Sequence, residues 1–382
     1  MKKIGIAIAG LGFIGPAHLE ALRRLPGANI VGISHSSIES ARQKAHALDV
    51  AKVYESYSDL IADPSVEVVH ICTPNHLHYA MAKEALLAGK HVVCEKPLAT
   101  TLEQADELVA LAQSTRLINA VHFNIRYYPL IRQMKVMREK GQLGHIFSIM
   151  GSYLQDWLFY NTDYNWRLEP EQSGDSRAIA DIGSHLLDLL EYISGLKVTA
   201  VMADFNTVHK TRKKPVKPIE TYSGKMLQPD EYADVPISTE DYASVLLRFD
   251  NGSKGVVTVS QVAAGRKNRL SLEIAGANQT FAWCSESPNE LWIGRRNEAN
   301  QVLMRDPALF DPAAAHLAGF PGGHNEGFPD TSKQLFKEVY QAIRNGQHQE
   351  GIYPTFADGR RELLLCEKIV ESHRKEGWVI VE

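Results

Sequence analysis

The sequence predicts two domains: an N-terminal α/β domain with a doubly wound parallel sheet, followed by an α+β domain with an open, mostly antiparallel sheet. Three observations support this prediction. The chain has 382 residues, which exceeds the usual size of one compact core. Up to residue 122, short apolar runs alternate with helical segments, as in repeated βαβ units, and longer strand-like runs then take over. We therefore expect domains over residues 1–123 and 124–382.

The strands expected in the first domain are short and strongly apolar, because a parallel sheet is buried on both faces. They are Ile4–Ala9, Asn29–Ser34, Val66–Cys72, His91–Cys94 and Leu117–Val121. Helices are expected between and after them, over Pro16–Leu25, Ile38–Leu48, His78–Ala88, Leu102–Gln113 and Tyr128–Glu139. The second domain is expected to contain strands Ile146–Tyr153, Val198–Phe205, Tyr242–Phe249, Ser253–Gln261 and Leu270–Ala275. Asp250-Asn251-Gly252 predicts a hairpin between two of these strands.

Composition excludes several classes of protein. The net charge of −4 argues against a nucleic-acid binder, and the five lysine and arginine residues in segment 209–217 are expected to form a solvated loop. No apolar run approaches the roughly 20 residues that span a bilayer, so no membrane partner is expected. Four widely spaced cysteines predict neither disulfides nor a thiolate metal site, which favours the cytoplasm. Lys2-Lys3 before Ile4–Ala9 also fits a signal peptide, but the glycine spacing that follows favours a buried first strand.

A glycine-rich turn follows the first expected strand directly and opens a helix. Its sequence is Gly10-Leu11-Gly12-Phe13-Ile14-Gly15. In a dinucleotide-binding Rossmann fold the first glycine allows a tight turn, the second lets the backbone approach the pyrophosphate, and the third allows close helix packing. The helix N-terminus adds N–H donors. This context favours dinucleotide binding over a glycine-rich turn without a ligand.

The end of the second strand bears on the choice between NAD and NADP. An NAD-specific fold usually carries an acidic residue there, whereas this chain has Ser34-His35-Ser36-Ser37. The absence of a carboxylate removes the usual obstacle to a 2′-phosphate, and the hydroxyls with His35 are suited to hold one. An ordinary polar strand end is an equally good interpretation, so NAD and NADP both remain open.

Two further groups of residues are suited to chemistry. Glu95-Lys96-Pro97 ends the fourth strand, where doubly wound sheets bind ligands, and an ammonium group there can stabilise alkoxide character. A surface Glu-Lys pair is the alternative. Asp181 and His185 lie four residues apart, hence on one face of a helix, where the carboxylate would raise the basicity of the imidazole for proton removal from an alcohol. A purely structural Asp-His pair is the alternative.

Several motifs together resemble one family. They are the glycine turn, Cys72-Thr73-Pro74-Asn75-His76-Leu77-His78, the stretch from Gly89 to Pro97, and Asp181 to His185 with Leu186-Leu187-Asp188. The chain resembles the glucose-fructose oxidoreductase, inositol dehydrogenase and MocA family along its whole length. The resemblance implies a Rossmann domain, a second sheet domain that pairs with a copy of itself, and an active site in the cleft between the two domains. The resulting assembly would be a homodimer or a homotetramer.

The resemblance also implies roles for individual residues. Lys96, Asp181 and His185 would form the catalytic group and contact substrate, with His185 as general acid or base. The cofactor would be bound by Gly10, Gly12, Phe13, Ile14, Gly15, Ser34, His35, Ser36, Thr73, Pro74, Asn75, His78, Glu95, Lys96, Asn124, Trp166 and Arg167, and Glu95 would hold the nicotinamide ribose. Asn124 and Arg126 would face the cleft, Arg126 toward substrate. Ser173-Gly174-Asp175-Ser176-Arg177 departs from the consecutive glycines of many relatives, so loop shape there stays open.

The segment from Tyr153 to Trp166 favours a sugar or polyol substrate. It interleaves aromatic rings, which pack on a pyranose face, with amide and carboxylate side chains, which bind hydroxyls. Tyr153 is therefore a candidate substrate-binding residue, although rings filling a core or an oligomer contact explain the composition equally well. No metal is expected, because His76, His78, His185 and His324 show no convincing ligand spacing.

These observations favour an NAD(P)-dependent dehydrogenase that moves a hydride to or from a secondary hydroxyl or keto group of a sugar, glycoside or cyclitol. Two alternatives remain open. One is a glycosidase that oxidises its substrate transiently and consumes no net cofactor. The other is a dinucleotide sensor without catalysis, which the joint presence of Lys96, Asp181 and His185 disfavours. The sequence does not choose the sugar, the carbon or the direction of reaction.

Overall fold

Two units make up the chain in the computed structural model, which describes residues 3–217, 227–346 and 351–382. The first unit contains Met1–Asn124 and Phe328–Leu363, and the second contains Ile125–Gly327 and Leu364–Glu382. The predicted boundary after residue 123 lies one residue from the end of the first segment. The structure differs from the prediction in giving part of the C-terminal region to the first unit.

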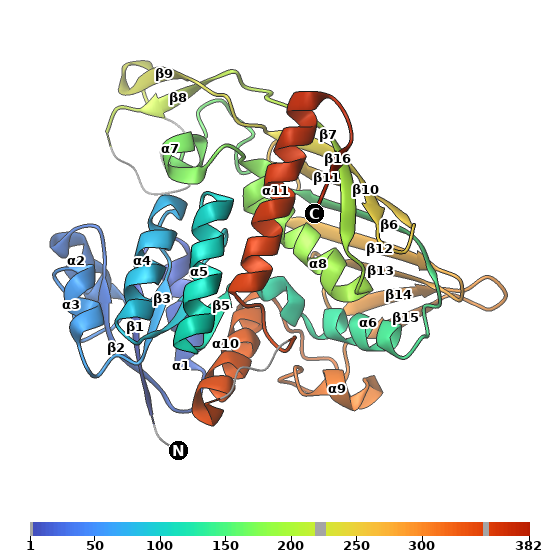
Figure 1. The fold of residues 1–382 in the computed structure, drawn as a ribbon, viewed down its shortest axis with the longest axis horizontal. Helices are drawn as coiled ribbons and strands as arrows, with labels where there is room; N and C mark the ends of the chain where they lie inside the picture. The colour runs from blue at the N-terminus through green and yellow to red at the C-terminus, as the bar shows by residue number, and fades with distance from the viewer. Residues whose placement is uncertain (1–2, 218–226, 347–350) are drawn as a thin grey trace. The chain divides into compact units, whose positions relative to one another are not determined.

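The first unit is a parallel five-stranded sheet with the strand order β2-β1-β3-β4-β5. Its strands are β1 (Ile4–Ala9), β2 (Ala28–Ser34), β3 (Val68–Ile71), β4 (His91–Cys94) and β5 (Asn119–Val121). Its helices are α1 (Ile14–Arg23), α2 (Ile38–Ala47), α3 (Tyr57–Ala62), α4 (Asn75–Leu87), α5 (Leu102–Thr115) and α10 (Phe328–Asn345). All of β1 and β3 is buried, as a parallel sheet covered on both faces requires (Figure 1).

The C-terminal residues join the first unit through apolar packing. Phe356 and Leu363, in helix α11 (Phe356–Lys375), belong to the same buried cluster as the strands of the parallel sheet. A Cβ atom at Gly359 would lie 2.8 Å from a methyl group of Val121, so this glycine allows the helix to approach β5 closely. Contacts between positions so far apart in sequence leave no local signal.

The second unit is built on a nine-stranded sheet with the order β15-β14-β13-β12-β6-β11-β10-β7-β16, in which β11 and β6 form the one parallel pair. Its strands are β6 (Ile146–Leu154), β7 (Val198–Asn206), β10 (Tyr242–Phe249), β11 (Lys254–Ser260), β12 (Arg269–Gly276), β13 (Thr280–Cys284), β14 (Glu290–Gly294), β15 (Gln301–Met304) and β16 (Val379–Ile380). The remaining segments are helices α6 (Pro129–Glu139), α7 (Pro170–Ser173), α8 (Ser184–Ser194) and α9 (Pro312–Ala315), with a separate pair of strands, β8 (Thr211–Pro215) and β9 (Tyr232–Pro236).

The predicted fold class, a parallel Rossmann sheet followed by a mostly antiparallel sheet, is confirmed. The hairpin at Asp250-Asn251-Gly252 joins β10 to β11, and Gly252 has the positive φ of 86° that this turn needs. Gly151, in β6, lies against helix α8. A Cβ atom at this position would come within 2.9 Å of the side chain of Leu186. Helix α8 therefore packs against one face of the antiparallel sheet.

One local prediction is wrong. Segment 209–217 was expected to be a solvated loop, but Thr211–Pro215 forms β8 and pairs with β9, and Arg212 is fully buried. Four acceptors bind the Arg212 guanidinium: the backbone carbonyls of Leu158, Tyr160 and Asp163 and the carboxylate of Asp241. Burial of an arginine is possible because these acceptors replace water.

Candidate active site

The glycine turn has the features of a phosphate-binding loop. Gly10 has a φ of 91°, and a Cβ atom there would lie 2.6 Å from the carbonyl oxygen of Cys72. A Cβ atom at Gly15 would lie 2.2 Å from the carbonyl oxygen of Gly10, whereas nothing lies within 4 Å of one at Gly12. Helix α1 follows with no side-chain cap and no acidic residue in its first turn. An open backbone at a helix N-terminus suits a dinucleotide pyrophosphate.

The end of β2 lies beside this turn. The Gly10 amide donates to the carbonyl of Ser34, and the Leu11 amide donates to Nδ1 of His35 at 3.4 Å. Burial and the nearby charge of Lys44 lower the pKa of His35, which keeps this nitrogen available as an acceptor. Ser36 is exposed, and Ser37 caps helix α2.

The residues predicted to line the cofactor after β3 meet the start of helix α4. Pro74 is its N-cap residue and Asn75 its first residue, and the helix has no acidic residue in its first turn. His78 is fully buried, and its two ring nitrogens lie against backbone carbonyls, Nε2 2.9 Å from that of Thr73 and Nδ1 2.7 Å from that of Pro97. It therefore links this loop to the one that follows Lys96. Contact of these residues with a cofactor stays a prediction.

Glu95 is buried, which contradicts the alternative of a surface Glu-Lys pair. One of its carboxylate oxygens, Oε1, accepts from Nε2 of His18 at 2.9 Å and from Nδ1 of His122 at 2.5 Å. Its other oxygen, Oε2, accepts from the Lys96 amide at 3.3 Å. The carboxylate is thus fixed in position immediately before Lys96, which is partly exposed and joined to Pro97 by a cis peptide bond.

The hydrogen bonds continue from Glu95 in both directions and form a buried histidine-glutamate chain. Nδ1 of His18 lies 2.9 Å from Nδ1 of His70, and Nε2 of His70 lies 2.8 Å from the hydroxyl of Tyr340. On the other side, Nε2 of His122 lies 3.0 Å from the hydroxyl of Ser332. The two end residues of this hydrogen-bonded chain, Tyr340 and Ser332, therefore both lie on helix α10. The chain links this helix to the sheet.

A single direction of donation satisfies the Tyr340–His70–His18–Glu95 part of this chain when the carboxylate is ionised and the rings of His18 and His70 are neutral. Burial raises the pKa of Tyr340 well above its usual range, so its hydroxyl keeps the proton and donates to His70. His70 then donates to His18, and His18 donates to Glu95. Burial lowers the pKa of His18 to about 4 and that of His70 well below its usual range. Burial alone would raise the pKa of Glu95, but the histidines hold it well below its usual range.

The same residues form the group of histidine and acidic side chains, within the part of the chain that the structure describes, whose ligand atoms lie close enough to share an ion. These are His18, Glu95 and His122, with atoms within 4.8 Å of one another. They are not the four histidines considered from the sequence. Hydrogen bonds account for their contacts.

Asp181 and His185 lie in one continuous helical segment. Asp181 is in a π-helical turn, η3 (Ile179–Gly183), which continues into α8. Of residues 176–191, these two are the ones that are not buried. Their placement on one face of the helix stays a prediction, because the turn that carries Asp181 is π-helical. π-Helical turns recur at functional sites. The ring of His185 lies 6.4 Å from that of Tyr153, measured between centroids.

Two donors hold the Asp181 carboxylate. Nε of Arg167 lies 3.2 Å from Oδ1, and Nε2 of Gln261 lies 2.9 Å from Oδ2. The Arg167 guanidinium also lies over the ring of Trp166, 4.5 Å from its centroid. The residues Trp166 and Arg167 were predicted to contact the cofactor, and the structure brings Arg167 to the candidate catalytic carboxylate. Sequence reasoning did not find Gln261, because nothing near it in sequence marks it.

Three other candidates have protein partners of their own. Arg126 forms a two-pronged ion pair with Asp188 of α8, and both residues are buried. Nδ2 of Asn124 donates to the hydroxyl of Thr331 at 2.7 Å. The hydroxyl of Tyr153 donates to Oδ1 of Asn268 at 2.8 Å. Their contacts with cofactor or substrate stay predictions.

The aromatic segment divides into two parts. Tyr164 packs in a small apolar cluster with Leu158, Leu168 and Ile237. Phe159 and Tyr160 are exposed, and their rings meet edge to face at 5.0 Å between centroids. Packing therefore accounts for part of the segment, and the exposed rings are available to a ligand.

A glycine turn at the carboxyl end of the first strand of a doubly wound sheet defines a dinucleotide-binding protein of the Rossmann class. Residues 4–123 match the model of the oxidoreductase family with an NAD-binding Rossmann fold, and residues 131–282 match the GFO/IDH/MocA C-terminal domain. The chain belongs to this family of oxidoreductases, as the sequence predicted.

Similar proteins are dehydrogenases of sugars and cyclitols. The chain is 30% identical to levoglucosan dehydrogenase of Pseudarthrobacter phenanthrenivorans, over 100% of this chain and 99% of the relative. It is 29% identical to myo-inositol 2-dehydrogenase of Thermotoga maritima, over 97% of both. A solved structure of levoglucosan dehydrogenase in complex with NADH and levoglucosan matches with a TM-score of 0.88 and 29% identity over 100% of both chains.

Proposed function

We propose that this protein is an NAD(P)-dependent dehydrogenase that oxidises a secondary hydroxyl of a pyranose, an anhydro-sugar or a cyclitol, or reduces the matching ketone. Family membership supports the reaction class, and the names of the relatives support the substrate class. The observation that carries the assignment in this chain is the pair Asp181 and His185, which are the partly exposed residues in the otherwise buried stretch 176–191.

When bound, the nicotinamide accepts or returns a hydride. The protein's own residues handle the proton and the charge. We assign His185 to proton removal from the substrate hydroxyl, and Asp181 to orienting His185 and stabilising its charged form. Lys96 is assigned to hydrogen-bond the reacting oxygen and to stabilise its negative charge in the transition state. The fixed carboxylate of Glu95, next to Lys96, suits a role in holding the nicotinamide ribose.

A substrate screen with matched variants tests this proposal. The wild type is mixed with levoglucosan, myo-inositol, glucose or glucose 6-phosphate and with NAD⁺ or NADP⁺, and nicotinamide absorbance is followed. Lys96→Ala, Asp181→Asn and His185→Ala should each lower kcat by about 10²–10⁴-fold, while the exposed control Lys375→Ala in helix α11 should not. Wild-type turnover by any of the three variants would refute the assignment of that residue. Cleavage of a nitrophenyl glycoside without net nicotinamide reduction would favour the glycosidase instead.

The proposal includes tolerance of NADP. Support comes from the serine-rich end of β2 and from Lys44, whose charge acts on His35. A carboxylate at the exposed Ser36 would repel a 2′-phosphate, and at about 4 Å this repulsion is worth about 1 kcal/mol or more. Ser36→Asp should therefore weaken NADP⁺ binding by about fivefold or more and leave NAD⁺ binding within twofold, as measured by fluorescence titration. Equal effects on both nucleotides would contradict the proposal.

A homo-oligomer that forms through the antiparallel sheet is also proposed. The strand register aligns Met202, Leu246, Val256 and Met150 across β7, β10, β11 and β6. The row then passes through Glu273 and Ala282 to Trp292 and Val302 at the other edge. Met202, Leu246, Met150, Trp292 and Val302 are exposed, and exposed apolar side chains gathered on one face favour association. Light scattering should give a dimer or tetramer, and Met150→Asp should shift it toward the monomer; a monomeric wild type would refute the proposal.

Cytoplasmic location is the last part of the proposal. The four cysteines form no disulfide, which suits a reducing compartment. In the described residues, no helix combines the length and apolar character needed to cross a bilayer. Fractionation of the cells that make the protein tests the location, and recovery from outside the cytoplasm would contradict it.

A further inference from the structure

Asp181 is connected through one amide side chain to a buried cluster of charges in the second unit. Nε2 of Gln261 donates to Asp181, and Oε1 of the same amide accepts from Nη1 of Arg177 at 3.3 Å. A guanidinium is only a donor and a carboxylate is only an acceptor, so a single orientation of the amide satisfies both neighbours. Arg177 therefore determines that Gln261 presents its NH₂ group to Asp181.

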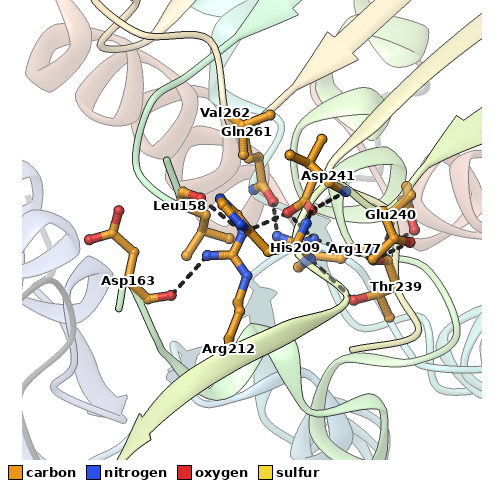
Figure 2. Close-up of polar contacts among 12 residues, drawn as sticks. Leu158, Asp163, Arg177, His209, Arg212, Thr239, Glu240, Asp241, Gln261 and Val262 are labelled. Carbon is orange, nitrogen blue, oxygen red and sulfur yellow. Dashed lines mark hydrogen bonds and ion pairs between the residues drawn. The ribbon is translucent and has the colours of Figure 1, made fainter. Parts of the chain in front are cut away.

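Arg177 is itself fixed on every side (Figure 2). Its side chain is fully buried, Nε donates to the hydroxyl of Thr239 at 3.2 Å, and Nη2 forms an ion pair with Asp241. Its backbone amide donates to Glu240, which also accepts from the amide of Ile179 at 2.9 Å. Glu240 thus holds the start of the π-helical turn that carries Asp181.

Asp241 joins this arrangement to the aromatic segment (Figure 2). Its Oδ1 also accepts from Nη2 of Arg212 at 2.7 Å, and its Oδ2 accepts from the amides of Val208 and His209. Arg212 in turn binds the backbone carbonyls of residues 158, 160 and 163. A continuous set of contacts therefore runs from the backbone of the aromatic segment to the candidate catalytic carboxylate.

Burial of this cluster carries a large desolvation cost. It places two guanidinium groups and two carboxylates in the interior, and well-packed apolar side chains are often at least as stable as buried ion pairs. The charged groups instead fix the orientation of the side chains, because each donor and acceptor has one geometry that satisfies its neighbours. The arrangement is suited to fixing orientation.

We propose that Gln261 and Arg177 are positioning residues that hold Asp181 in the orientation needed for its action on His185. The inference rests on the proposed function, because it takes Asp181 as catalytic. Loss of the Gln261 donor removes a hydrogen bond that favours the ionised carboxylate, so Asp181 becomes easier to protonate and less well oriented. Arg167 is a charged partner of Asp181, and the buried cluster of Arg177, Glu240 and Asp241 lies behind Gln261. His185 follows Asp181 by four residues in the sequence.

The contacts of Arg212 with the aromatic segment predict a different kinetic effect. Arg212 contacts the backbone of the aromatic segment directly, whereas it reaches Gln261 only through Asp241 and Arg177. Substitution of Arg212 by Lys keeps one charge for Asp241 but loses the fork that binds the three carbonyls. We expect this change to act mainly on KM for the sugar, whereas changes at Gln261 act mainly on kcat and on its pH dependence.

The decisive variant is Gln261→Met, which keeps length and removes both polar atoms. We expect kcat to fall about tenfold or more, the acidic limb of the kcat–pH profile to move to higher pH, and Kd for NAD⁺ to stay within twofold. Lys375→Ala, an exposed substitution in helix α11, should change none of these. Unchanged kcat and an unchanged acidic limb in folded Gln261→Met would overturn the proposal.

A second variant covers the case in which Gln261→Met fails to fold. Gln261→Glu keeps the shape and gives Arg177 a charged partner, but it places a second carboxylate against Asp181. The acidic limb should again move to higher pH, and a wild-type profile would overturn the proposal. Lys96→Ala and His185→Ala distinguish failure of the proposed function from failure of the positioning role of Gln261. If they retain wild-type turnover, the proposed function fails; if they lose it while the Gln261 variants match the wild type, only the positioning role fails.

Discussion

The buried histidine-glutamate chain predicts how the stability of the first unit depends on pH. His18 is fully buried, and its pKa is lowered from 6.5 to about 4, first by desolvation and then by the charge of His122. A depressed folded-state pKa means that the unfolded chain takes up the proton first as the pH falls. The stability contributed by neutral His18 is therefore complete above pH 6.5 and is lost progressively between pH 6.5 and about 4.

The size of the effect follows from the same shift. Each pH unit in this window costs about 1.4 kcal/mol for one proton, which gives a loss of about 2 kcal/mol between pH 6.5 and 5 and about 3 kcal/mol in all. His70 and His78, whose pKa values are also lowered by burial, add to the slope of the wild type in the same direction. His18→Gln retains a donor for Glu95 but cannot titrate. The free energy of unfolding of this variant should therefore vary less steeply with pH than that of the wild type, by an amount that corresponds to about one bound proton.

Chemical denaturation of the full-length protein at a series of pH values measures these slopes. The transition that belongs to the first unit is identified as the one that added NAD⁺ moves, and its free energy is then measured without nucleotide. His46→Gln, an exposed substitution in α2 of the same unit, serves as control and should keep the wild-type slope. Equal slopes for the wild type and His18→Gln would refute the argument, because His18 would then carry its proton in the folded state.

Three further outcomes are expected. Gly10→Ala should lower the free energy of unfolding by about 1–3 kcal/mol, because it forces a positive φ on alanine and a contact with the Cys72 carbonyl. Gly12→Ala should leave the melting temperature unchanged. It should weaken NAD⁺ binding by about tenfold or more, which corresponds to about 1.4 kcal/mol. Comparable melting losses in both variants would contradict this. Arg126→Met should cost about 3–5 kcal/mol in denaturation, since it removes the guanidinium that forms an ion pair with the buried Asp188 carboxylate; a fully stable variant with a raised sugar KM would instead support substrate contact. Dialysis against a chelator should leave NAD⁺ affinity and melting temperature unchanged, because hydrogen bonds already account for the histidine-glutamate chain, and a fall in either would indicate a bound ion.

The elements of the first unit could be predicted closely because each has a local signal. The strands Ile4–Ala9 and His91–Cys94 agree with the prediction at both ends, since buried parallel strands are rich in apolar residues; the first is buried along its whole length and the second from Val92 onward. Helix α5 begins where Thr101 accepts from the amide of Gln104, as its cap sequence indicates. Helix α4 begins three residues earlier than expected, because Pro74 and Asn75 start it at the loop itself.

The candidate site was predictable only in part. The pair Asp181 and His185 follows from helical spacing, which is a local property. The neighbours that fix Asp181 do not: Arg167 is 14 residues away and Gln261 is 80 residues away. Segment 209–217 shows the limit most clearly, because a run of basic residues normally predicts exposure, and yet Arg212 is buried with acceptors supplied by two distant segments.

From the amino-acid sequence follow the order of the elements, the phosphate-binding turn and the residue types available for hydride and proton chemistry. These properties depend on backbone conformation and side-chain periodicity within a few residues. The tertiary structure alone decided that a C-terminal helix completes the nucleotide-binding unit, and that Glu95 lies between two histidines. It also decided that Gln261 faces Asp181. Hydrogen bonds and ion pairs of this kind depend on distances between atoms that chain folding brings together, and no periodicity records them.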